Sequence, residues 1–189
     1  MKTKDLIIAG AFTALYVVIL MVCVSVLGAI PILFLMAPFL LSVILGPVYM
    51  LYVMKVPKPG AILILAVIAG LITSLAGMWF ALVWSFAIGL IAQLIARLGK
   101  YQSKTIYRIS YCVFACTNMG PFWMLILAKK SFLAACVNYY GPEYAAKLDA
   151  LTPGWIVFVL AGIAILGGLA GGALGSSMLG KHFEKAGVI

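Results

Sequence analysis

The stretch LIIAGAFTALYVVILMVCVSVLGAIPILFLMAPFLLSVILGPVYMLYVM, residues 6–54, contains no Asp, Glu, Lys or Arg. A bilayer core about 30 Å thick is crossed by roughly 20 apolar residues in a helix, so this run is long enough for two membrane-spanning helices. The segment Gly28-Ala29-Ile30-Pro31 divides the run near its middle, and Gly and Pro favour turns. We therefore expect two spans, at about 6–27 and 32–53.

Three more charge-free runs follow, at residues 59–96, 109–128 and 150–180. The first is long enough for two spans and the others for one each. We expect these spans at about 60–75, 79–98, 109–128 and 153–179. The sequence thus predicts an all-α integral membrane protein, with a single six-helix membrane domain over residues 1–189.

The composition excludes an ordinary soluble domain. Of the 189 residues, 66% are hydrophobic and 9% are charged, whereas soluble domains are about half apolar and about one quarter charged. The net charge of +9 sits in short clusters beside the ends of the expected spans, which is typical of orientation signals. It does not indicate a nucleic-acid partner.

Counting Lys and Arg on alternate sides of the spans predicts the orientation. One side has ten and the other has three, namely Lys129, Lys130 and Lys147. The positive-inside rule places the ten in the cytoplasm. We therefore expect both termini in the cytoplasm, residues 129–152 as an outer loop, and a multi-pass protein of a prokaryotic plasma membrane.

Local signals refine the expected helices. Pro38 and Pro47 lie inside the second span, and each removes a backbone donor, which predicts a kinked or broken helix. Thr152-Pro153 is typical of a helix start. The N-terminal run resembles a signal peptide, but it is too long and no small-x-small cleavage site follows it, so we expect it to be retained.

Residues that would support catalysis are missing from the expected spans. Apart from Arg97 near the end of the span at about 79–98, they contain no Asp, Glu, Lys, Arg or His, and His182 lies in the expected cytoplasmic tail. The chain has no phosphate-binding GxxxxGK[ST] motif. Cys112 and Cys116 are four residues apart, but without a nearby His or acid they fit small core residues better than metal ligands. We expect no enzymatic activity, no metal site and no cofactor.

Small residues four apart allow two helices to approach closely in lipid. Gly10 and Ala14 form such a pair in the first span. Their spacing alone favours packing within the bundle over docking of a partner. The last span carries a denser set, for which packing is favoured more strongly: Gly167, Gly168, Gly171, Gly172 and Gly175.

All four tryptophans fall in the outer halves of the expected spans, at Trp79, Trp84, Trp123 and Trp155. They indicate either an aromatic pocket that opens outward or a belt at the membrane interface. Asn118 is the strongest single candidate for a binding residue, because a mid-membrane amide needs a partner, although an interhelical hydrogen bond would also supply one. The pocket would be completed by Met119, Phe122, Asn138, Tyr139 and Tyr140.

The chain resembles the substrate-binding S components of energy-coupling factor (ECF) importers, in particular the Trep-Strep (MptD-like) group, over nearly its whole length. The segments that carry the resemblance are Lys4-Asp5-Leu6, Ala14-Leu15-Tyr16, Ile30-Pro31-Ile32 to Pro38-Phe39, Ile44-Leu45-Gly46-Pro47, Lys55-Val56-Pro57-Lys58, Gly120-Pro121-Phe122, Leu151-Thr152-Pro153-Gly154-Trp155 and the ending Lys181-His182-Phe183-Glu184-Lys185-Ala186-Gly187.

This resemblance implies a six-helix protein that captures a scarce small nutrient outside the cell. It implies as partners a transmembrane T component and two ABC ATPase subunits, which would supply the energy for uptake. The family's AxxxA docking face corresponds here to Gly10 and Ala14, which favours docking for this pair. The cargo class is vitamin-like, and the group also suggests haem, for which Tyr139, Tyr140, Met78 or Met119 would have to be the ligand. The alternative is a non-transporting membrane scaffold or assembly subunit, which would need no outward cavity.

Overall fold

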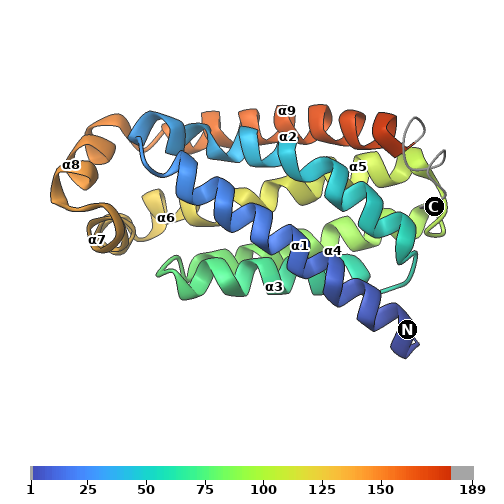
Figure 1. Cartoon of the computed structure of the whole chain (residues 1–189). Coiled ribbons are helices and arrows are strands. Elements are labelled where there is room, and N and C mark those ends of the chain that lie inside the picture. Colours follow the sequence, from blue (N-terminus) through green and yellow to red (C-terminus); the bar gives the residue numbers. More distant parts are fainter. Residues whose placement is uncertain (1, 180–189) are drawn as a thin grey trace.

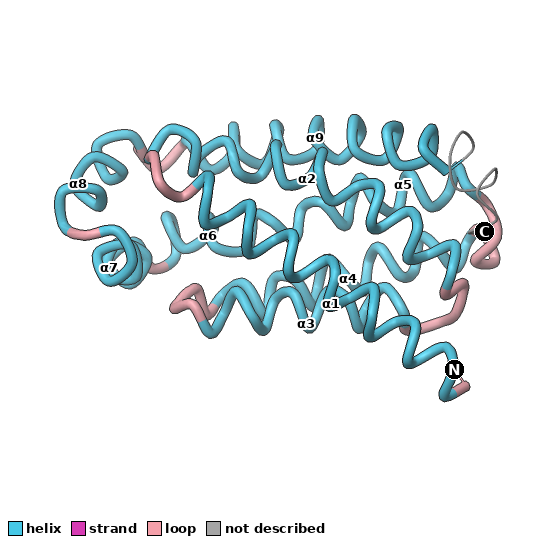
Figure 2. Tube along the Cα trace, viewed as in Figure 1, coloured by secondary structure: helices cyan, strands magenta, loops and turns pink. Residues whose placement is uncertain are grey.

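The computed structural model describes residues 2–179, which form helices joined by short connections (Figure 1; Figure 2). The elements are α1 (Thr3–Leu27), α2 (Pro31–Lys55), α3 (Ala61–Leu75), α4 (Phe80–Leu98), α5 (Lys104–Phe114), the 3-10 segment η1 (Ala115–Met119), α6 (Gly120–Leu127), α7 (Lys129–Tyr140), α8 (Pro142–Leu151) and α9 (Ile156–Met178).

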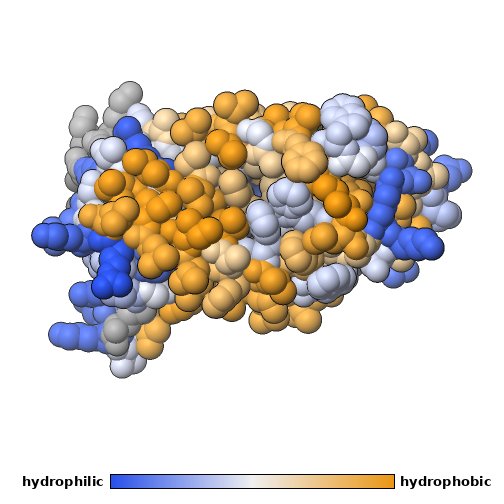
Figure 3. All heavy atoms as spheres, turned by 180° about the vertical axis from the view of Figure 1, so that it is seen from behind, coloured by the Kyte–Doolittle hydropathy of each residue, from blue (hydrophilic) through white to orange (hydrophobic). Residues whose placement is uncertain are grey.

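The described part of the chain contains five helical segments that are long and apolar enough to cross a membrane: α1, α2, α4, the run from α5 to α6, and α9. The remaining expected span, the third in order at about 60–75, corresponds to α3, which has 15 residues. At 1.5 Å per residue α3 is about 22 Å long, shorter than the apolar core of a bilayer. Figure 3 shows a broad hydrophobic surface across the middle of the molecule, with hydrophilic side chains at the two ends.

The start of α1 and the end of α9 lie at one end of the bundle, and α7 and α8 lie at the other (Figure 1). Positive charge follows the same division. Eight Lys and Arg residues lie in or beside the helix ends that share the first end, and Lys129, Lys130 and Lys147 belong to α7 and α8. The expected cytoplasmic motif at residues 181–187 lies outside the described residues.

Glycine brings α2 and α9 into close contact along their length. A Cβ atom at Gly46 would overlap the backbone of Gly171, and one at Gly171 would overlap the carbonyl of Ser42. Gly167 and Gly175 meet α2 in the same way, at Phe39 and Gly46. The prediction that the glycines of the last span serve packing is confirmed.

Of the two outcomes expected from proline in the second span, a kinked or a broken helix, the break does not occur. Helix α2 is continuous from Pro31 to Lys55, with Pro38 and Pro47 inside it. Side chains bond the backbone between the two prolines: Ser42 Oγ donates to the Pro38 carbonyl at 2.5 Å, and the Tyr111 hydroxyl donates to the Ser42 carbonyl. These bonds tie the middle of α2 to its own backbone and to α5.

The fifth span begins earlier than expected and is not a uniform α-helix. It starts at Lys104, where Ser103 caps it by accepting a hydrogen bond from the Ile106 amide. It changes to 3-10 geometry between Ala115 and Met119, before Gly120-Pro121 starts α6. Pro121 has no N–H to continue the α-helical ladder, which explains the change at this point.

The expected outer loop is two helices, α7 and α8, joined at Gly141, whose φ of +88° suits glycine. Lys129 links the start of α7 to the end of α8, because its Nζ lies 2.5 Å from Asp149 Oδ1 and donates to the Thr152 carbonyl at 3.2 Å. Thr152 does not cap the last span as predicted. Its hydroxyl donates back to the Leu148 carbonyl at 2.8 Å and so ends α8, while α9 begins at Ile156.

Candidate binding cavity

A cavity of about 210 Å³ lies at the end of the bundle that carries α7. Its walls come from the C-terminal half of α1, the N-terminal half of α2, the end of α3, the start of α4, η1, α6 and α7. Because successive helices run in opposite directions, these segments meet at one end. The cavity is therefore assembled from parts of the chain that are far apart in sequence.

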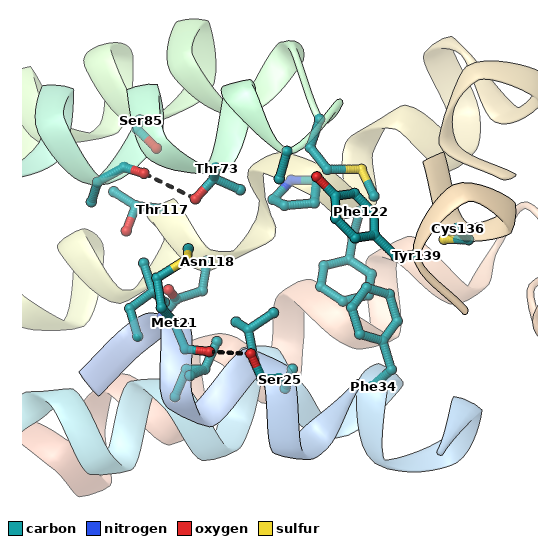
Figure 4. A pocket seen from close by; sticks show the side chains of 18 of the residues that line it. Met21, Ser25, Phe34, Thr73, Ser85, Thr117, Asn118, Phe122, Cys136 and Tyr139 are labelled. Carbon is teal, nitrogen blue, oxygen red and sulfur yellow. Dashed lines mark hydrogen bonds between the residues drawn. The ribbon is translucent and has the colours of Figure 1, made fainter. Parts of the chain in front are cut away.

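Polar side chains gather on one side of the cavity (Figure 4). Ser85 and Thr117 are buried there, with 3% and 7% of their surface exposed. Asn118 lies beside them and donates through Nδ2 to Ser42 Oγ at 3.2 Å. Thr117 and Asn118 are consecutive residues of the 3-10 segment η1, and both line the cavity.

Aromatic side chains form the opposite side, with Phe34, Phe122 and Tyr139 labelled in Figure 4. The rings of Phe34 and Phe122 have centroids 5.2 Å apart, and Tyr140 continues the group with its ring centroid 6.5 Å from Phe34. A Cβ atom at Gly28 would overlap the Tyr140 hydroxyl, so this glycine allows Tyr140 to cross the end of α1. The arrangement gives the cavity an aromatic side of mutually tilted rings, against which the ring of a ligand can pack.

Helix α7 contributes Cys136, Tyr139 and Tyr140 to the cavity. Cys136 is 1% exposed, and burial raises the pKa of its thiol to about 11. Burial also raises the pKa of Tyr140. Both groups are therefore neutral near pH 7, and they add no charge to the site.

The structure brings some of the sequence-predicted site residues to this cavity. Asn118, Phe122, Tyr139 and Tyr140 line it. Asn118 lines the cavity, and its Nδ2 also makes the interhelical hydrogen bond that the alternative interpretation expected. The other predicted site residues do not line the cavity. Met119 is 1% exposed in the core, and Asn138 is exposed on α7. Trp79, Trp84 and Trp123 also lie outside the lining.

These three tryptophans belong to a separate aromatic group on α4, α6 and α9. The Trp84 and Trp123 rings have centroids 5.1 Å apart, and Trp123 meets the exposed Phe158 edge-on. The Trp84 indole N–H donates to the Cys116 carbonyl at 2.7 Å, and Trp79 is 51% exposed. This exposure fits an interfacial belt better than the wall of this cavity.

Comparison with known proteins identifies the family. A model of the Trep_Strep family, described as hypothetical bacterial integral membrane proteins, matches residues 3–185. The chain belongs to the Trep_Strep family. No curated protein and no solved structure matches it.

In this Trep_Strep protein Gly10 and Ala14 lie on an exposed face of α1. A Cβ atom at Gly10 would have no neighbour within 4 Å among the described residues. The interpretation that this pair packs within the bundle is therefore wrong, in contrast to the glycines of α9. The exposed face leaves room for another helix to approach closely.

Sequence reasoning missed the contribution of α1, α2 and α3 to the Trep_Strep cavity. These helices supply Tyr16, Ser25, Phe34 and Thr73 among others. Hydroxyl residues inside otherwise apolar spans were the available signal, since Thr73, Ser85 and Thr117 all line the cavity. The signal was weak because Ser42 and Ser110, which are equally polar, bond other helices in the core.

Proposed function

We propose that this protein is the substrate-capture subunit of an ECF-type ABC importer and binds a small organic nutrient at its outer face. The cavity beneath α7 carries the proposal, because it combines an apolar surface with a few convergent polar groups, as small-molecule sites do. The excess of Lys and Arg at the opposite end supports the orientation in which the cavity faces outward.

Under this proposal the energy for uptake comes from partner subunits, a transmembrane T component and two ABC ATPases. The exposed Gly10/Ala14 face of α1 is the proposed docking surface for the T component. Its small side chains allow a partner helix to approach closely. It lies away from the cavity, whose residues on α1 are Tyr16, Leu20, Met21, Val24 and Ser25.

The test is reconstitution in vesicles with the three partner subunits and ATP. We expect the complete set to concentrate nutrient from growth medium inside vesicles, measured by mass spectrometry of the lumen, and the chain alone to bind nutrient without concentrating it. Accumulation by the chain alone, driven by a proton or sodium gradient, would contradict the proposal. If the complete set of subunits neither binds nor accumulates any nutrient, the alternative function as a membrane scaffold would be favoured.

Docking and capture are separable in the same assay. Gly10→Leu and Ala14→Leu add bulk to the docking face, so we expect recovery of the T component and uptake to fall at least tenfold while binding by the isolated chain persists. The matched control is Gly162→Leu, at an exposed glycine of α9 that also has no neighbour within 4 Å among the described residues. Equal recovery of the T component with all three variants would show that this face of α1 does not bind the T component.

A further inference from the structure

No residue that lines the cavity in the described part of the chain is Asp, Glu, Lys, Arg or His. Lys129, at the start of α7, is paired with Asp149 and the Thr152 carbonyl. An ionised carboxylate or ammonium buried in the cavity would therefore lose its hydration without gaining an opposite charge, which is strongly unfavourable. The lining selects for uncharged molecules.

The polar side of the cavity has unused hydrogen-bonding capacity. The side-chain hydroxyls of Ser85 and Thr117 make no hydrogen bond to any described residue, and Asn118 uses its Nδ2 but not its Oδ1. Tyr16, which is 1% exposed and also lines the cavity, has a hydroxyl without a partner among the described residues. Hydroxyls both donate and accept, so this wall matches a ligand edge that carries a donor and an acceptor.

The volume limits the size of the ligand. Sites for drug-sized molecules measure about 300–1,000 Å³, and this cavity measures about 210 Å³. One or two fused rings fit this space between the polar side and the rings of Phe34 and Phe122. Haem is much larger and its propionates are anionic, so it falls outside the ligand class that these features favour.

We propose that the cavity binds a small, uncharged ring compound with an amide-like edge, placed so that this edge meets Ser85, Thr117, Asn118 and Tyr16 while the ring lies against Phe34, Phe122 and Tyr140. The assignment rests on the proposed function, since it names the class of nutrient that the capture subunit takes. Amides fit the wall because each offers one acceptor oxygen and N–H donors on one edge.

The test uses the full chain in lipid nanodiscs and two matched pairs of probes, nicotinamide with nicotinate and indole-3-acetamide with indole-3-acetate. Each pair keeps the ring and changes the charge. We expect at least one amide to raise the melting temperature in a saturable way, with at least tenfold higher affinity than its carboxylate. Carboxylate binding as tight as amide binding, or no saturable shift with either amide at millimolar concentration, would overturn the assignment.

Variants of the polar side locate the bound edge. Ser85→Ala with Thr117→Val should weaken amide binding by roughly 5- to 150-fold, because two partners of a buried polar edge are removed. The matched controls, Ser177→Ala and Thr105→Val, change exposed hydroxyl residues that do not line the cavity and should bind normally. Equal affinity in the Ser85→Ala/Thr117→Val variant and in the two controls would overturn the placement of the ligand.

Tyr16→Phe separates a loss of binding from a loss of folding. Removing a buried hydroxyl that has no protein partner should leave the melting temperature of the ligand-free chain unchanged or raised. The same variant should bind the amide about 2- to 10-fold more weakly. Unchanged amide binding by Tyr16→Phe would remove Tyr16 from the site.

Failure of this assignment can be told apart from failure of the proposed function. If the amides bind but the complete set of subunits does not concentrate them, the ligand class stands and the importer role fails. If the complete set concentrates an anionic nutrient instead, the importer role stands and the ligand class fails.

Discussion

Gly46 and Gly171 face each other where α2 packs against α9, and the space between them holds no side chain. In lipid, where apolar surface gains little by leaving the solvent, close packing of backbones is the main source of helix association. The same residue type has different roles along the chain. Gly171 is fixed by its neighbours, whereas Gly10 and Gly162 have no neighbour within 4 Å among the described residues.

Gly171→Ala should therefore destabilise the protein. Its Cβ would overlap the Ser42 carbonyl, and because backbone cannot move aside easily we expect a loss of about 3 kcal/mol, at the upper end of overpacking costs. The measurement is thermal unfolding in detergent. Gly162→Ala, in the same helix, is the control and should be neutral or slightly stabilising. Equal melting temperatures for the two variants would contradict the α2–α9 packing.

Cys136 provides a pH-dependent reporter inside the cavity. Because burial raises its pKa to about 11, the folded chain holds the neutral thiol at pH 8, and the reactive thiolate increases as the pH rises toward 11. In a chain with Cys136 as its single cysteine, we expect maleimide labelling to accelerate throughout this range. A cysteine at the exposed position 134 should instead level off near pH 9. Identical pH profiles would show that Cys136 is not buried.

At the scale of elements, the interruption of the fifth span has the clearest consequence for the site. In a 3-10 turn consecutive residues are about 120° apart and rise about 2.0 Å each, against about 100° and 1.5 Å in an α-helix, so η1 changes the direction of the side chains that follow it. Thr117 and Asn118 of η1 both line the cavity, just before Gly120-Pro121 starts α6. A polar pair inside a span, followed closely by Gly-Pro, is thus a local signal for irregular helix geometry.

The connection between α7 and α8 depends on Gly141. Alanine at this position meets no atom within 4 Å among the described residues, but φ of +88° strains any residue with a Cβ atom. We expect Gly141→Ala to cost about 1–2 kcal/mol and to increase amide hydrogen exchange in residues 129–151. Gly154→Ala is the control, because that glycine has neither a positive φ nor a close neighbour in the described region. Similar exchange in both variants would exclude strain at this joint.

At the scale of the whole molecule, charge and shape divide the protein into two ends. The described Lys and Arg residues are concentrated at the end where α1 starts, and the cavity lies at the other. In a membrane with a potential that is negative inside, the basic end is expected to stay in the cytoplasm. The cavity would then face the outside, as a capture subunit requires.

Cysteine labelling in intact cells tests this orientation. A single cysteine at the exposed position 138 on α7 should react with an impermeant maleimide added outside. One at the exposed position 102, between α4 and α5, should react after the inner face is opened. Labelling of position 138 from the cytoplasmic side alone would reverse the orientation, and the proposed outward capture would fail with it.

The sequence by itself determined the parts of the fold that depend on solvent preference. Charge-free runs predicted the membrane-spanning helical segments, because a bilayer excludes charged residues. Local chemistry also predicted the glycine packing of the last span. Asn118, Phe122, Tyr139 and Tyr140 could be found because polar or aromatic residues near one end of the bundle are few.

Only the tertiary structure decided where the cavity lies and which residues line it. In lipid every span is apolar on all sides, so hydrophobic periodicity does not reveal which face of α1 or α2 points inward. The tryptophans of α4 and α6 therefore indicated an aromatic group outside the cavity, while Tyr16, Phe34 and Thr73, which the sequence did not single out, line it. Gly10 and Gly171 have the same local chemistry, and contacts between distant segments alone made one exposed and the other part of the core.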